Sequence, residues 1–87
     1  MAKIEIYSTA MCPYCVAAKN LLTARKLAWE EYRIDRDPAR QSEMLQRSSQ
    51  RRSVPQIFIE GRHVGGYEEL VVLDRAGGLD ALVAAGD

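Results

Sequence analysis

The stretch STAMCPYCV, residues 8–16, follows an alternating polar and apolar segment and holds the only two cysteines of the chain. The alternation in residues 3–7 predicts a β-strand. Pro13 is typical of the first turn of an α-helix, because a backbone N–H at that position would have no partner within the helix. Cys12 and Cys15 therefore lie where a strand passes into a helix, and this junction predicts an α/β fold.

The rest of the chain continues this pattern in the order βαβα–ββα. Asp37 and Pro38 are typical of a helix cap and first helical position, and Glu60-Gly61 of a tight turn between two strands. We expect strands at residues 3–7, 29–35, 56–59 and 62–65. We expect one helix over residues 13–26, a second from residue 38 to about 48–50, and a third from residue 67 that ends at Gly77-Gly78. One or two further helical turns are expected within residues 79–85. Strands joined by a helix run parallel and hairpin strands run antiparallel, so we predict a four-stranded mixed sheet flanked by helices.

Length and charge limit the classes of protein to consider. At 87 residues and 47% hydrophobic, residues 1–87 are expected to form a single domain. The net charge is zero, and no apolar run is long enough to span a membrane. We therefore expect no nucleic-acid or membrane partner, and a cytoplasmic monomer. The charges are unevenly spread: Lys and Arg outnumber Asp and Glu by four in residues 1–63, and Asp and Glu outnumber Lys and Arg by four in residues 64–87. Regions of both signs suit a small zwitterionic ligand.

A helix start gives the two cysteines different chemistry. Unpaired N–H groups and the helix dipole favour the thiolate form of Cys12, which is the nucleophilic form. Cys15 lies one turn along, close enough to attack a mixed disulfide formed on Cys12, and we expect it to be less exposed. The pattern therefore predicts that Cys12 attacks and Cys15 resolves.

Two other roles for the pair stay open. A closed zinc site needs four ligands, and two Cys with one His cannot supply them in one chain. A metal or cluster site shared between subunits and an inert structural pair remain as alternatives. We favour the redox role because Cys-x-x-Cys pairs in cytosolic proteins are more often catalytic or metal-binding than structural.

Three motifs resemble the glutaredoxin family, and in particular its bacterial dithiol members. They are CPYC at residues 12–15, SVPQIFI at 53–59 and GGYEEL at 65–70, in the family's order and over essentially the whole chain. The resemblance implies a thioredoxin fold and a redox-active centre for electron transport and cell redox homeostasis. It implies reduction of protein disulfides and glutathione mixed disulfides, with glutathione as co-substrate and no bound cofactor or metal. The competing functions are a thioredoxin-like reductase that does not use glutathione and an iron–sulfur cluster carrier with glutathione ligands.

The resemblance also implies a glutathione groove. Val54-Pro55 matches the family's cis-proline corner, where the Val54 backbone pairs with an extended peptide. The backbone N–H groups of Tyr67 and Glu68 match those that hold the γ-glutamyl carboxylate at a helix start. Glu69 matches the acid that takes the ammonium, although the family uses Asp there, and Tyr14 matches the aromatic wall.

Cations beside this groove depart from the family pattern. Many relatives carry Lys or Arg three residues before the first cysteine, where this chain has Thr9. Lys19 and the Arg51-Arg52 pair are the nearest replacements. We expect Arg47, Arg51 and Arg52 to be solvated surface charges, with contact between Arg51 or Arg52 and a ligand carboxylate as the alternative.

Overall fold

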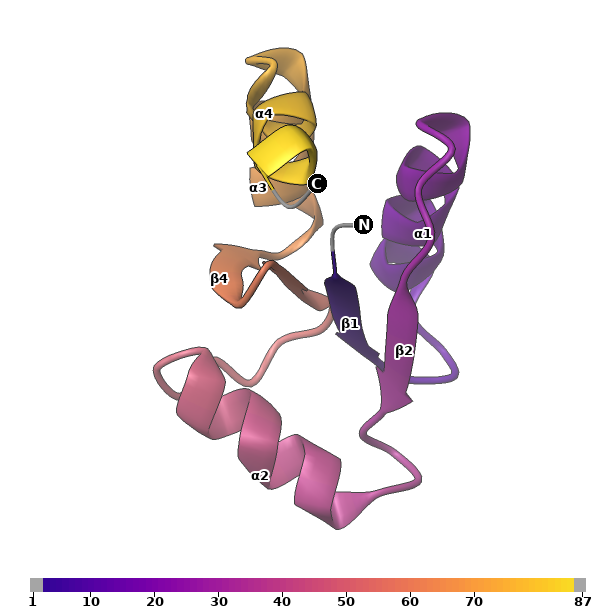
Figure 1. The fold of residues 1–87 in the computed structure, drawn as a ribbon. Helices are drawn as coiled ribbons and strands as arrows, with labels where there is room; N and C mark the ends of the chain where they lie inside the picture. Colours follow the sequence, from indigo (N-terminus) through magenta and orange to yellow (C-terminus); the bar gives the residue numbers. More distant parts are fainter. Residues whose placement is uncertain (1–2, 86–87) are drawn as a thin grey trace.

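The computed structural model describes residues 3–85, which form the predicted strands and helices in the predicted order (Figure 1). The elements are β1 (Ile4–Ser8), α1 (Pro13–Ala24), β2 (Glu30–Arg33), α2 (Pro38–Arg47), β3 (Gln56–Ile59), β4 (Arg62–Gly65), α3 (Tyr67–Arg75) and α4 (Gly78–Ala85). Asp37 caps α2 as expected, its carboxylate accepting from the Ala39 N–H at 3.1 Å. Within residues 3–85, none of the helices has both the length and the apolar character needed to span a bilayer.

The four strands form one mixed sheet in the order β2-β1-β3-β4. β1 runs parallel to β2 and antiparallel to β3, and β3 and β4 form the antiparallel hairpin. Tyr7 near the end of β1 pairs with Gln56 at the start of β3. The segment that follows β1, which carries Cys12, therefore meets the segment that precedes β3, which carries Val54-Pro55.

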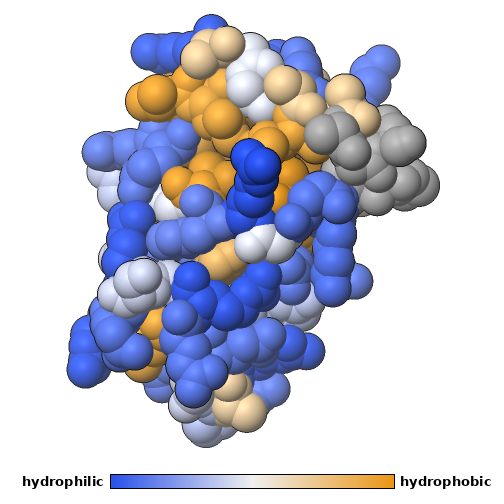
Figure 2. Space-filling view, turned by 60° about the vertical axis from the view of Figure 1, so that its left-hand side comes forward, coloured by the Kyte–Doolittle hydropathy of each residue, from blue (hydrophilic) through white to orange (hydrophobic). Residues whose placement is uncertain are grey.

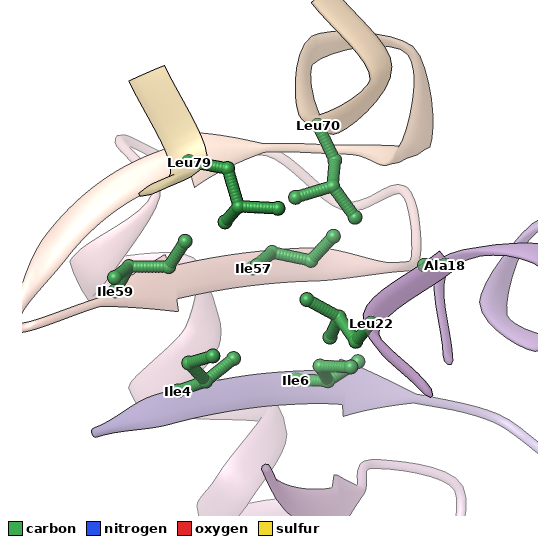
Figure 3. Close-up of a cluster of buried hydrophobic side chains, with 8 residues drawn as sticks. All are labelled: Ile4, Ile6, Ala18, Leu22, Ile57, Ile59, Leu70 and Leu79. Atoms are coloured by element: carbon green, nitrogen blue, oxygen red, sulfur yellow. The ribbon is translucent and has the colours of Figure 1, made fainter. Parts of the chain in front are cut away.

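Helices cover both faces of the sheet. α1, α3 and α4 lie over one face and α2 lies over the other (Figure 1). Alternate residues of a strand point to opposite faces, so β1 contributes to two apolar clusters. The larger contains Ile4, Ile6, Ala18, Leu22, Ile57, Ile59, Leu70 and Leu79 (Figure 3). The smaller contains Tyr7, Met44 and Phe58.

The end of α1 differs from the prediction. The helix ends at Ala24 and Lys26 takes a positive φ of 60°, so the chain turns two residues earlier than expected. Ala18 and Leu22 of α1 are buried, whereas Ala24 in the last position of the helix is exposed.

The outer surface is uneven in polarity. Figure 2 shows apolar side chains gathered in the upper half of its face, where α3 and α4 lie in Figure 1, and hydrophilic side chains over α2 below. Val64, Val72, Leu73 and Leu82 line a shallow groove between β4, α3 and α4.

Candidate active site

Cys12 and Cys15 are joined by a disulfide at the start of α1, with their Cα atoms 5.2 Å apart. Cys12 is the N-cap residue, with extended backbone angles, and Pro13 takes the first helical position as predicted. The Cys15 N–H donates to Cys12 Sγ at 3.1 Å. The side chain of Cys12 is 9% exposed and that of Cys15 is 1% exposed, so an incoming thiol or disulfide reaches Cys12 first.

Val54-Pro55 lies against this disulfide. The peptide bond between the two residues is cis, which confirms the expectation. Cys12 Sγ lies 3.7 Å from the Val54 carbonyl oxygen. The pairing of β1 with β3 explains this contact, because it sets the start of β3 beside the end of β1.

A groove of about 220 Å³ lies beside the redox pair. It brings together all six residues that the sequence predicts for the binding site: Tyr14, Val54, Pro55, Tyr67, Glu68 and Glu69. It also contains Arg51, Ser53 and Gly66. Ser53 and Gly66 lie within the motifs at residues 53–59 and 65–70. Their place in these motifs could have identified them as groove residues from the sequence.

Two tyrosines form one wall of the groove. The ring of Tyr14 on α1 lies 6.0 Å from the ring of Tyr67 on α3, centre to centre, with an angle of 30° between the planes. Because the two residues come from different helices, this wall exists only when α1 and α3 pack on the same face of the sheet. It offers an apolar surface beside the sulfur atoms.

The groove also holds a pair of opposite charges. Arg51 Nη2 lies 2.9 Å from Glu69 Oε1, and this hydrogen bond holds the pKa of Glu69 below its ordinary value. The Glu69 carboxylate lies close over Gly65, where an added Cβ would come within 2.7 Å of Oε1. Gly65 has a φ of +119°, so the backbone there requires glycine, and a side chain at this position would displace the Glu69 carboxylate. Of the two arginines considered from the sequence, Arg51 is the one that lines the groove.

Other charged and polar groups near the site have different partners. Lys19, a possible replacement for the cation missing at Thr9, pairs with Glu31 at 3.0 Å. His63 is exposed, and its ring stacks on Phe58. Within residues 3–85, no group of three or more His, Cys, Asp and Glu side chains is placed to hold a metal ion.

Known proteins share both the sequence and the architecture. The family model for glutaredoxin matches residues 4–64. The chain is 47% identical to glutaredoxin 3 of Escherichia coli (strain K12) over 83 residues, which cover 95% of this chain and 99% of that protein. The chain belongs to the glutaredoxin family. A glutaredoxin from Brucella melitensis, solved in solution, superposes with a TM-score of 0.84 at 39% identity, covering all of this chain and 94% of that one.

As a glutaredoxin, the protein has a thioredoxin fold and acts as a thiol–disulfide oxidoreductase. A second structural relative is the buckwheat glutaredoxin–glutathione complex. It matches with a TM-score of 0.85 at 27% identity, over 94% of this chain and 76% of that one.

Proposed function

We propose that this glutaredoxin reduces protein disulfides and glutathione mixed disulfides, with glutathione as its co-substrate. The observation that carries the proposal is the groove beside Cys12, which is lined by all six residues expected for glutathione. The buckwheat relative in complex with glutathione supports the same ligand. The groove also offers charges of both signs, as a zwitterionic tripeptide requires.

Glutathione fits this groove through main-chain and charged contacts. Its extended backbone pairs with the backbone of Val54 in the manner of an added strand. The N-cap of α3 is Gly66, which has no side chain to accept a hydrogen bond from the first turn, so the N–H groups of Tyr67 and Glu68 are open to the γ-glutamyl carboxylate. Glu69 accepts from the ammonium group, and Arg51 offers a guanidinium to a carboxylate.

Cys12 performs the attack on a glutathionylated protein. The helix start and the Cys15 N–H stabilise the Cys12 thiolate, which attacks the glutathione sulfur of the mixed disulfide. The protein sulfur leaves as a thiolate and takes a proton from water. The thiolate of a second glutathione then attacks the glutathione sulfur of the Cys12 mixed disulfide, which forms oxidised glutathione and releases Cys12 as a thiolate.

Cys15 enters when the substrate is a disulfide within a protein. Cys12 attacks one sulfur and forms a mixed disulfide with the substrate. Cys15 then attacks Cys12, releases the substrate as a dithiol and leaves the Cys12–Cys15 disulfide that the structure contains. Two glutathione molecules reduce this disulfide and are themselves oxidised, so no bound cofactor takes part.

The setting that we propose is the cytoplasm, with the protein acting as a monomer in cell redox homeostasis. The bacterial relatives support this setting. Its partners are glutathione and proteins that carry disulfides or glutathione adducts.

A titration with S-methylglutathione, which binds without reacting, tests the groove. We expect amide shifts at Val54, Tyr67 and Glu69 in the NMR spectrum of the oxidised protein and none at Val72. We also expect turnover in an assay coupled to glutathione and its reductase. Shifts confined to other residues would remove the groove from the proposal, and absence of turnover would remove glutathione as co-substrate.

A further inference from the structure

Exposed hydrophobic side chains gather around Cys12. Within residues 3–85, the large hydrophobic side chains that are exposed are Met11 at 92%, Tyr14 at 60%, Val16 at 51% and Val72 at 67%. Three of these four lie within four residues of Cys12. Exposed apolar side chains that gather at one place mark an interaction surface, so this distribution needs an explanation.

The proposed glutathione groove explains Tyr14 but neither Met11 nor Val16. Tyr14 lines the groove and contacts Tyr67, whereas Met11 and Val16 are not among the residues that line it. Val16 follows Cys12 by four residues, so helical geometry sets it one turn beyond Cys12 on the same side of α1. Met11 directly precedes Cys12. We call Met11 and Val16 together the Met11–Val16 surface.

Two ion pairs lie close to this surface along the chain and in space. Lys19, one turn along α1 from Val16, forms an ion pair with Glu31 at 3.0 Å. Arg33 donates to both carboxylate oxygens of Asp35 at 2.8 and 2.7 Å, and Asp35 also accepts from the Ala10 N–H. The surface beside Cys12 therefore presents apolar side chains next to neutralised charges, which suits an apolar and uncharged partner.

We propose that the Met11–Val16 surface docks protein substrates whose disulfide cysteines are flanked by apolar residues. A protein disulfide that reacts at Cys12 must bring its own main chain against the residues next to Cys12. The flanking side chains of such a substrate can then pack on Met11 and Val16 and leave water. The inference rests on the thiol–disulfide oxidoreductase activity and not on glutathione as co-substrate.

A single-turnover experiment without glutathione tests this surface. The fully reduced protein is mixed with an excess of a cyclic peptide that has one disulfide with Leu on both sides of each cysteine. Cys12 attacks the disulfide, Cys15 completes the exchange, and the protein is oxidised while the peptide leaves with two thiols. The reaction is stopped with acid and both products are measured by mass spectrometry. A second peptide has Ser in place of Leu, and bis(2-hydroxyethyl) disulfide serves as a small substrate.

We expect the double variant Met11→Gln/Val16→Gln to react about tenfold more slowly with the Leu peptide. A tenfold change in rate corresponds to the free energy that is lost when one apolar side chain is no longer buried. Each rate is divided by the rate of the same disulfide with dithiothreitol, which removes differences in intrinsic reactivity. The Ser peptide and bis(2-hydroxyethyl) disulfide should change by less than about twofold, because neither packs on the surface.

Val72→Gln is the matched control, because the exposed fraction of Val72 lies between those of Met11 and Val16 but the residue belongs to α3. It should leave all three rates unchanged. An unchanged rate with the Leu peptide in the double variant would overturn the proposal. Equal losses with all three substrates would also overturn it, because the change would then act on Cys12 itself.

Discussion

Cys12 and Cys15 share one helix, but their surroundings differ. Cys12 caps the helix, accepts the Cys15 N–H and retains some exposure, whereas Cys15 is buried under the first turn. An N–H that points at a sulfur stabilises its thiolate, and burial keeps the second sulfur from external thiols. These two environments support the prediction that Cys12 attacks and Cys15 resolves.

Substitution of each cysteine separates the two roles. Cys12→Ser should abolish reduction of both glutathione mixed disulfides and protein disulfides, since no nucleophile remains at the exposed position. Cys15→Ser should retain reduction of glutathione mixed disulfides and lose dithiol reduction of protein disulfides. Both activities are measured with the assay coupled to glutathione reductase. Activity retained in Cys12→Ser would show that the roles are assigned wrongly.

The ion pair between Arg51 and Glu69 makes a second prediction at the residue scale. The hydrogen bond from Arg51 holds the pKa of Glu69 below its ordinary value, so Arg51→Gln should raise that pKa toward the ordinary value. An NMR titration of the Glu69 side-chain carboxyl measures the change. Arg52→Gln is the matched control and should leave the titration as it is. The same shift in both variants would mean that overall charge, and not this contact, sets the pKa.

At the scale of elements, a charged contact fastens α2 to the sheet. Glu5 in β1 is buried, and both terminal nitrogens of Arg47 donate to its carboxylate, at 3.2 and 3.0 Å. Arg47 also donates to the Tyr7 hydroxyl at 2.8 Å and stacks over the Phe58 ring. The expectation that Arg47 is a solvated surface charge is therefore wrong. It was missed because its partners lie 40 and 42 residues away in the chain.

Loss of this contact should destabilise the protein in a pH-dependent way. Burial acts to raise the pKa of Glu5, but hydrogen bonds from Arg47 and Tyr32 outweigh it and hold the pKa below its ordinary value. The contact is therefore at full strength above the unfolded pKa of about 4.3 and weakens as the pH falls through the lower folded value. Arg47→Met should lower the free energy of unfolding by about 2 kcal/mol at pH 7, because the buried Glu5 carboxylate loses its two hydrogen bonds from Arg47 and keeps only the one from Tyr32 and the longer ion pair with Lys3.

Urea unfolding at pH 7 and pH 3 measures this effect. The loss in Arg47→Met should shrink at pH 3, where Glu5 of the variant is protonated and needs no cation. Arg40→Met is the control on the same helix, since Arg40 pairs with Glu43 at an exposed position. It should cost less stability than Arg47→Met at pH 7. A loss of equal size at both pH values would mean that Arg47 acts through packing alone.

For the whole molecule, the core between the sheet and three helices supports the groove. Leu70 of α3 and Leu79 of α4 are fully buried and lie over Ile57 and Ile59 of β3 (Figure 3). α3 also carries Tyr67, Glu68 and Glu69 at its first turn. The packing of α3 and α4 on the sheet therefore determines the position of the groove residues that α3 carries.

Leu79→Ala tests how much α4 contributes to this core. Removal of a fully buried leucine side chain should lower the free energy of unfolding by about 3 kcal/mol, through lost burial and the cavity that remains. Domains of this size have stabilities of only about 5–10 kcal/mol, so the loss is large. Urea unfolding measures it, with the exposed Val72→Ala as the control that should change by less than about 1 kcal/mol. Equal values for the two variants would show that Leu79 is not part of the core.

The amino-acid sequence by itself determined the order of the elements, and it was enough to predict which residues form the candidate site. Apolar periodicity, Pro13 at a helix start and the Asp37 cap are local signals, because each depends on residues within one or two turns. The three motif segments could also be found without a structure. All six residues expected for glutathione line one groove.

Only the tertiary structure decided how these segments meet. The position of β1 between β2 and β3 brings the Val54 carbonyl oxygen to 3.7 Å from Cys12 Sγ. The pairing of Arg51 with Glu69 and that of Arg47 with the buried Glu5 arise in the same way. Each contact joins residues at least 18 positions apart, whose separation in space depends on strand order and helix packing. Local patterns hold no information on that separation, because they report only what neighbouring residues along the chain favour.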